Sequence, residues 1–361
     1  MANVLDLRRR IRSVKSTRQI TKAMKMVSAA KLRRAQDRAL AARPYAQRIT
    51  SVLASLERRI EVLDPKTGNL RHPLFATRPE KRVLLLVVSG EKGFAGAFNT
   101  NILKAAFHFL AANEDKEIDI EAIGRKAREQ MRRRYPAAVF VESTEENPAD
   151  GSPLIRRVRS RKARVEVTGD HPGLLEKLTH DQIQSLTQDM IARYVHEEID
   201  ACYLVYNEFK SVIQQRIVVE RLLPLIEPGK HQVTEAIEPS AEERERAAEA
   251  AVSSGVSLTP EDYAEADAEA TKFGTAEVDY IYEQPARELY NGLLPRYVAS
   301  MLFHALAESV AAEHAARMTA MDAATNNASD MIDSLTLYMN RVRQAAITKE
   351  IIEIVSGAAA L

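Results

Sequence analysis

The sequence predicts an α/β protein in which two long terminal helices pair as an antiparallel coiled coil beside a small, mostly parallel, Rossmann-like domain. Three observations lead to this prediction. Residues 1–67 contain no glycine and no prolines other than Pro44 and Pro65, and residues 296–356 contain neither residue type. Between them, apolar runs alternate with helical segments. Strands that alternate with helices are typical of parallel sheets.

The C-terminal segment is too long to fit inside a globular domain. At a rise of about 1.5 Å per residue, a helix over residues 296–356 is roughly 90 Å long. A compact domain of this size is only about 30–40 Å across. The helix must therefore leave the globule, and because it carries an apolar stripe it needs a partner, for which the N-terminal segment is the obvious choice.

Apolar residues recur at helical spacing in both terminal segments, as expected for a coiled-coil seam. In the N-terminal segment the stripe is Leu7, Ile11 and Val14 and then, after a slip in register, Ile20, Met24 and Val27. In the C-terminal segment the stripe comprises Leu302, Leu306, Val310, Met318, Met321, Ile332, Leu335, Tyr338 and Val342. Polar residues interrupt the seam, namely Thr17, Thr21, Asn326 and Ser329, so we expect an irregular pair with contacts outside the coil.

The order of segments predicts four regions. Residues 1–64 and 285–361 are the two coiled-coil helices, residues 80–226 the α/β domain, and residues 227–279 an acidic insert. Within the domain we expect strands at 83–89, 118–123, 138–141 and 201–207, helices at 99–112, 125–135 and 174–198, and extended structure at 211–222. Residues 142–168 and the acidic insert are polar enough to be mobile surface loops.

A net charge of +1 hides a strong asymmetry. Residues 1–59 hold sixteen Lys or Arg against three acidic residues, whereas residues 227–279 hold fourteen acidic residues against four basic ones. The N-terminal helix is therefore basic and the insert acidic. The single cysteine, Cys202, excludes an internal disulfide and fits a reducing compartment. No apolar stretch reaches the roughly 20 residues that span a bilayer.

No catalytic or cofactor-binding pattern emerges from the sequence. The turn at residues 89–96, SGEKGFAG, follows a strand and precedes a helix, where phosphates often bind. It lacks both the Lys-Ser/Thr pair of a Walker loop and the spacing of a dinucleotide site, so a tight structural turn is the favoured interpretation. The eight histidines form no zinc pattern. We therefore expect no cofactor, no metal and no enzymatic activity of the chain alone.

Both ends resemble one known family. Residues 16–31 read STRQITKAMKMVSAAK and are followed by Arg43-Pro44-Tyr45, and residues 313–328 read EHAARMTAMDAATNNA. Residues 340–358 read NRVRQAAITKEIIEIVSGA. These runs resemble the gamma subunit of the rotary proton-translocating ATP synthase of bacteria. The match is looser in the centre, at residues 92–99 and at Leu222-Leu223-Pro224-Leu225.

The resemblance implies a central-stalk rotor that transmits torque between a membrane c-ring and a catalytic ring of three alpha and three beta subunits, with epsilon as a further partner. It implies a peripheral position on the cytoplasmic face of the bacterial plasma membrane, without direct membrane insertion. By motif match, Met24 and Lys25 would meet the lever loops of beta. A polar contact with beta would be made by Arg317, Gln344, Thr348 and Glu350. We expect these polar groups to be available to a partner on the surface of the coil.

Two other functions compete with the rotor. A nucleotide-using α/β enzyme with helical arms would bind or hydrolyse nucleotide as an isolated chain. A coiled-coil scaffold or nucleic-acid-binding protein would use the basic N-terminal helix and show strongly salt-dependent DNA binding. The density of motifs at both ends favours the rotor, for which no nucleic-acid partner is expected. For the acidic insert we expect a mobile or marginally helical regulatory arm that approaches basic surfaces through its charge.

Overall fold

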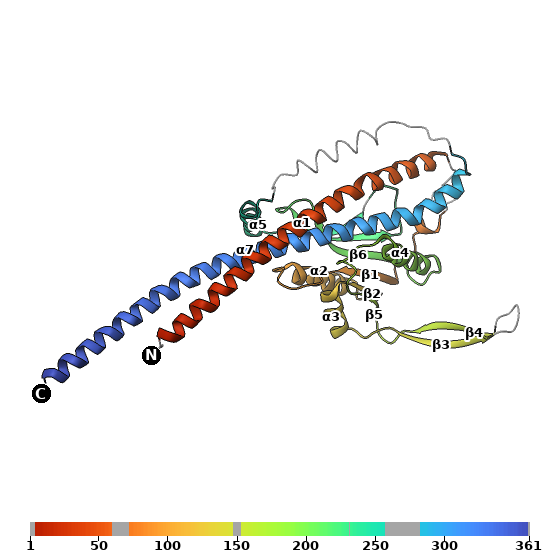
Figure 1. Ribbon diagram of the computed structural model, residues 1–361. Helices are drawn as coiled ribbons and strands as arrows, with labels where there is room; N and C mark the ends of the chain where they lie inside the picture. The colour runs from red at the N-terminus through yellow and green to blue at the C-terminus, as the bar shows by residue number, and fades with distance from the viewer. Residues whose placement is uncertain (1–3, 60–71, 147–152, 231, 257–281, 360–361) are drawn as a thin grey trace.

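A computed structural model describes residues 4–59, 72–146, 153–230, 232–256 and 282–359. The predicted coiled coil is confirmed: α1 (Val4–Arg59) and α7 (Ala286–Ala359) lie side by side and antiparallel (Figure 1). Pro44 and Pro295 lie inside these helices without ending them. The C-terminal end of α7 projects beyond the N-terminal end of α1 (Figure 1).

The α/β domain is built on a six-stranded sheet in the order β5-β2-β1-β6-β7-β8. The first four strands are parallel, and β7 and β8 are antiparallel to their neighbours. The strands are β1 (Arg82–Val88), β2 (Glu117–Ile123), β5 (Val165–His171), β6 (Ala201–Phe209), β7 (Gln215–Leu223) and β8 (Gln232–Ile237). The mostly parallel sheet of the prediction is therefore confirmed.

Helices cover both faces of the sheet, as the nearly continuous apolar sequence of β1 requires. In β1, Val83, Leu85 and Val87 join one core cluster and Leu84, Leu86 and Val88 the other. The first cluster includes α2 (Phe98–Ala112) and α3 (Arg125–Arg134), and the second includes α4 (His180–Val195) and the short 3-10 helix η1 (Pro73–Phe75). α7 contributes residues 290–307 to the second cluster and 311–318 to the first, so it crosses from one face to the other.

The two segments expected as mobile loops contain regular structure. β3 (Val139–Glu146) and β4 (Pro153–Ser160) form a separate antiparallel ribbon, and the expected third strand of the sheet is part of it. The fourth parallel strand is instead β5, which was not predicted and whose residues 165–168 lie at the end of the segment expected as a loop. In the acidic insert, β8 extends the sheet and α5 (Ala241–Ser254) follows it. Residues 257–281 of the insert lie outside the described residues.

α5 is a well-formed helix despite its charge. Ser240 and Glu243 make a reciprocal capping box, and Gly255 ends the helix in the left-handed conformation with φ 65°. These two signals stabilise the ends of a short helix. The expectation of a marginal helix is wrong because alanines on one face of α5, Ala247, Ala250 and Ala251, are buried against the rest of the protein.

Candidate functional site

The turn after β1 is where the coil meets the α/β domain. The Gly90 amide donates to Asn99 Oδ1 at 2.8 Å, which ties the turn to the start of α2. A β-carbon added at Gly90 would lie 2.8 Å from the carboxyl carbon of Glu313 on α7. A larger residue here would therefore clash with the Glu313 side chain, and glycine avoids this clash. Ligands of open α/β sheets commonly bind at this carboxyl edge, and in this chain α7 lies there.

Arg317 joins α7 to the same turn. Its guanidinium donates to Glu313 Oε1 and to the Gly93 carbonyl oxygen at 3.3 Å. Arg317 is 8% exposed and Glu313 is 4% exposed. A buried ion pair with further hydrogen bonds holds its partners in a defined geometry, and removing one partner leaves an uncompensated charge. The ion pair orients the Arg317 guanidinium, and the hydrogen bonds from that guanidinium to the carbonyl oxygens of Lys92 and Gly93 connect α7 to the domain.

His314 lies beside this pair in its uncharged form. Burial, and then the positive charges of Arg317, Lys31 and Lys92, lower the pKa of His314 to about 4. Its Nδ1 lies 3.1 Å from Arg317 Nη1, and with neutral imidazole this nitrogen accepts a hydrogen bond from the guanidinium. Protonation would remove this acceptor and place two cations in contact.

Further along the coil, the seam is polar where an apolar one was predicted. Lys25 Nζ lies 2.8 Å from Asp322 Oδ1, and Thr325 Oγ1 donates to Thr21 Oγ1 at 2.8 Å. The predicted apolar positions Ile20 and Val27 are exposed instead. The positions buried instead are Thr21, Lys25 and Ser28, so the predicted register of this segment is wrong by one position.

The displaced apolar side chains border a groove of about 1120 Å³ between α1 and the α/β domain. Ile20, Met24 and Val27 form part of one wall, and Lys92, Phe94 and Arg125 part of the opposite side. Phe94 is 74% exposed and has a φ of 60°, which is unusual for a residue other than glycine. An exposed apolar surface with a basic rim is typical of a protein contact site.

The six predicted contact residues fall into two groups. Met24 is half-buried at the groove, Lys25 is buried in the seam and Arg317 is buried at the junction with the domain. Gln344, Thr348 and Glu350 are exposed on the projecting end of α7. The expectation that all the polar contact residues are available to a partner is wrong for Arg317, because Glu313 and two backbone carbonyls of the turn already bind it.

The sequence analysis missed Glu313 and Asp322, the partners of Arg317 and Lys25. The spacing of Glu313 and Arg317, one helical turn apart, was a visible signal. Asp322 could not be found in this way because its partner is on the other helix. Within the described parts of the chain, no group of three or more metal-ligating side chains is present and no helix is both long and apolar enough to cross a membrane.

Comparison with known proteins places this architecture in a family. A family model described as ATP synthase matches residues 3–361. The ATP synthase gamma chain of Solibacter usitatus is 44% identical over 360 residues, covering 100% of this chain and 99% of the relative. The gamma chain of Anaeromyxobacter sp. (strain Fw109-5) is 38% identical over 363 residues, with complete coverage of both. This chain belongs to the ATP synthase gamma-chain family.

The family assignment confirms the resemblance carried by the terminal motifs. The matches to these relatives also include the acidic insert, because they extend over practically the whole length of both chains. Among solved structures, the rotor of the Euglena gracilis mitochondrial ATP synthase matches with a TM-score of 0.49 and 16% identity, covering 95% of this chain and 98% of that one. As a gamma-family member, the chain is a subunit of the ATP synthase complex.

Proposed function

We propose that this chain is the central-stalk rotor subunit of a bacterial proton-translocating ATP synthase, and that it transmits torque between the membrane c-ring and the catalytic ring of three alpha and three beta subunits. Catalysis belongs to the ring and not to this chain. The epsilon subunit is a further partner, and the complex lies on the cytoplasmic face of the plasma membrane with this chain outside the bilayer.

The junction between α7 and the turn after β1 carries this proposal. A subunit that transmits torque must not let its shaft rotate against its base. Arg317 binds the shaft to the turn through the carbonyl oxygens of Lys92 and Gly93, and the carboxyl group of Glu313 packs beside Gly90. The same helix enters both core clusters of the domain. Packed interiors are stiff and transmit strain rather than absorb it. A twist applied to the coil would therefore reach the domain.

Two surfaces are available for the catalytic ring. Met24 and its exposed apolar neighbours border the basic groove, and Gln344, Thr348 and Glu350 stand on the projecting end of α7. Lys25 and Arg317 act at these contacts by positioning α1 and α7. An asymmetric coil presses differently on three equivalent subunits, and a difference in contact free energy is what shifts each of them to a different nucleotide affinity.

The test is recovery of the complex from membranes with a tagged chain, with the partners identified by mass. We expect alpha, beta, epsilon and c subunits in fixed proportion. Recovery of the chain without alpha and beta would contradict the proposal. The nucleic-acid alternative is tested by measuring how the DNA affinity of the chain falls with salt, with an unrelated basic coiled coil as the control. Any basic surface binds DNA in a salt-dependent way, so the same dependence in both proteins would not support this alternative.

The enzyme alternative is tested with the purified full-length chain. We expect no nucleotide turnover, because α7 lies at the carboxyl edge of the sheet where a nucleotide would bind. Turnover by a partner-free preparation that is lost when Lys92 is changed to Ala would favour the enzyme. A matched change at Lys104, an exposed lysine on α2 away from the turn, is the control.

A further inference from the structure

The acidic insert lies directly over the Lys25–Asp322 pair. Ser253 near the end of α5 places its hydroxyl 3.1 Å from Lys25 Nζ and 3.3 Å from Asp322 Oδ1. The guanidinium of Arg33 on α1 donates to the Gly255 carbonyl oxygen just beyond α5. Figure 1 shows α5 beside the region where α1 and α7 cross. One short helix therefore contacts both members of the coil.

The contact surface of α5 is apolar and its charge faces away. Ala250 and Ala251 are completely buried and Val256 nearly so, in the same core cluster as Ala29 and Leu32 of α1. The acidic residues Glu242, Glu245 and Glu249 are exposed. In this structure the insert contacts the basic helix through packed small side chains and through hydrogen bonds from Lys25 and Arg33, and it contacts α7 through the hydrogen bond of Ser253 to Asp322.

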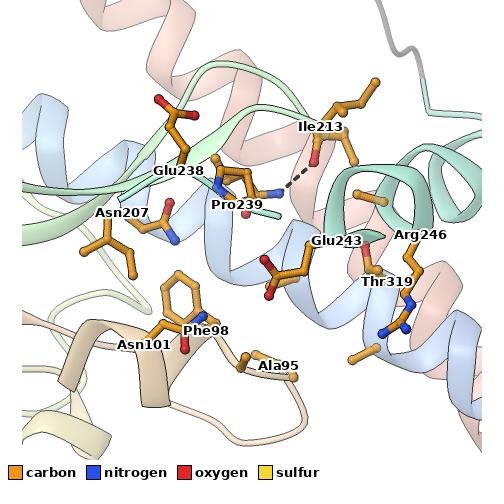
Figure 2. Close-up of a pocket in the computed structure, with 18 of the residues that line it drawn as sticks. Ala95, Phe98, Asn101, Asn207, Ile213, Glu238, Pro239, Glu243, Arg246 and Thr319 are labelled. Carbon is orange, nitrogen blue, oxygen red and sulfur yellow. Dashed lines mark hydrogen bonds between the residues drawn. The ribbon is translucent and has the colours of Figure 1, made fainter. Parts of the chain in front are cut away.

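α5 is held at one end and spans a cavity at the other. A cavity of about 290 Å³ separates its first two turns from the start of α2 and from α7. Figure 2 shows Glu243 and Arg246 projecting from α5, with Phe98 and Thr319 on other sides of this cavity. At that end Ala247 is buried, but the cavity interrupts the packing around it, and elements with fewer buried contacts are those that open locally.

We propose that α5 is a removable cover on the coil, closed in this structure, which hides Lys25 and Asp322 and exposes them when it swings away. This proposal rests on the rotor function and adds a control to it. With the cover closed, Lys25 and Asp322 are about nine-tenths buried and a partner subunit cannot reach them, although the groove beside Met24 stays open. With it open, a cation on α1 and an anion on α7 become available. β8 remains in the sheet as the fixed end, and residues 238–240 are the hinge.

The cover is tested first in the full-length chain, through the reactivity of Lys25 toward an amine-acylating reagent followed by mass spectrometry. Ala251→Glu introduces a carboxylate on the buried face of α5, which cannot stay closed over it without burying a charge. Val252→Glu introduces the same group at the next position, which is 68% exposed. The exposed lysines Lys15 and Lys22 on the same helix provide the internal reference.

We expect acylation of Lys25 to be about tenfold faster in A251E than in the wild type, and unchanged in V252E. Hydrogen exchange of the α5 amides should rise in A251E alone. An unchanged Lys25 rate would overturn the proposal. If hydrogen exchange of the α5 amides does not rise in A251E, the acylation rate of Lys25 is measured in the double variant A250E/A251E. A rate equal to that of the wild type in the double variant would also overturn the proposal.

The second test uses the assembled complex. ATP hydrolysis by complexes with A251E should differ at least twofold from that of V252E complexes, and the difference should persist at high salt, because the closed contact is not held by long-range charge. Equal rates would contradict the control function of α5. Failure of the wild-type chain to assemble would instead contradict the rotor proposal, and the Lys25 measurement would still decide whether α5 covers the coil.

Discussion

The carboxyl group of Glu313 occupies the space beside Gly90 in which any larger residue would place its β-carbon. The distance from that β-carbon position to Glu313 Cδ is 2.8 Å, shorter than real side chains show. Arg317 holds the carboxylate in place, so Glu313 cannot simply move away. A glycine in a turn that looks like a phosphate-binding loop is therefore explained by the passage of the C-terminal helix.

This relationship predicts that Gly90→Ala destabilises the protein by about 1–3 kcal/mol, the usual cost of adding a group to a packed site. The free energy of unfolding is measured by urea denaturation of the wild type and the variant. The cost should shrink clearly in a Glu313→Ala background, where the clash with the carboxyl is absent. Gly93→Ala is the matched control, since nothing lies within 4 Å of its β-carbon position. Equal losses for the two glycine variants would refute the close approach.

The Lys25–Asp322 pair should contribute coupling that a double-mutant cycle can measure. Both side chains are about nine-tenths buried, at 9% and 11% exposure. Lys25→Ala and Asp322→Ala should each cost about 3–5 kcal/mol, because each leaves an uncompensated charge in the seam. The double variant should cost much less than the sum. Additive losses would mean that the two groups do not interact in solution.

His314 should make stability depend on pH on the acid side. Its pKa is lowered to about 4 from the usual 6.5, so the unfolded chain binds the proton more readily than the folded one. The stability due to neutral His314 is complete above pH 6.5 and is lost as pH falls from 6.5 toward 4. The slope should approach about 1.4 kcal/mol per pH unit within that window. Unfolding of His314→Gln, measured over the same range, should lack this component.

The exposed residues of α7 should affect coupling without affecting folding. Gln344→Ala, Thr348→Ala and Glu350→Ala remove side chains that stand on the surface, so the melting temperature of the chain should shift by less than about 2 °C. Complexes with these variants should lose ATP-driven proton pumping or turnover. Wild-type rates in all three would count against the contact assignment. Arg317→Ala, in contrast, should lower the melting temperature as well, since its guanidinium is bound inside the chain.

The terminal helices, their pairing and three of the four parallel strands (β1, β2 and β6) could be predicted from the sequence because their signals are local and repeated. A long span without glycine or proline has few alternatives to helix, and a run such as VLLLVV in β1 must be covered on both faces. The family motifs at residues 16–31, 313–328 and 340–358 are likewise properties of the sequence itself. These features do not depend on the tertiary contacts between distant segments.

Which side of α1 faces α7 was decided only by tertiary structure. Periodicity alone placed Ile20 and Val27 in the seam, yet Lys25 and Thr21 lie there. Their partners Asp322 and Thr325 are 297 and 304 residues away, so a local pattern could not indicate them. The same reason applies to α5. Its charge predicted a mobile arm, but its alanines are buried by contact with α1 and α7, which are distant in sequence. The sequence determined the elements and the family, and long-range packing determined which polar groups are buried and what covers them.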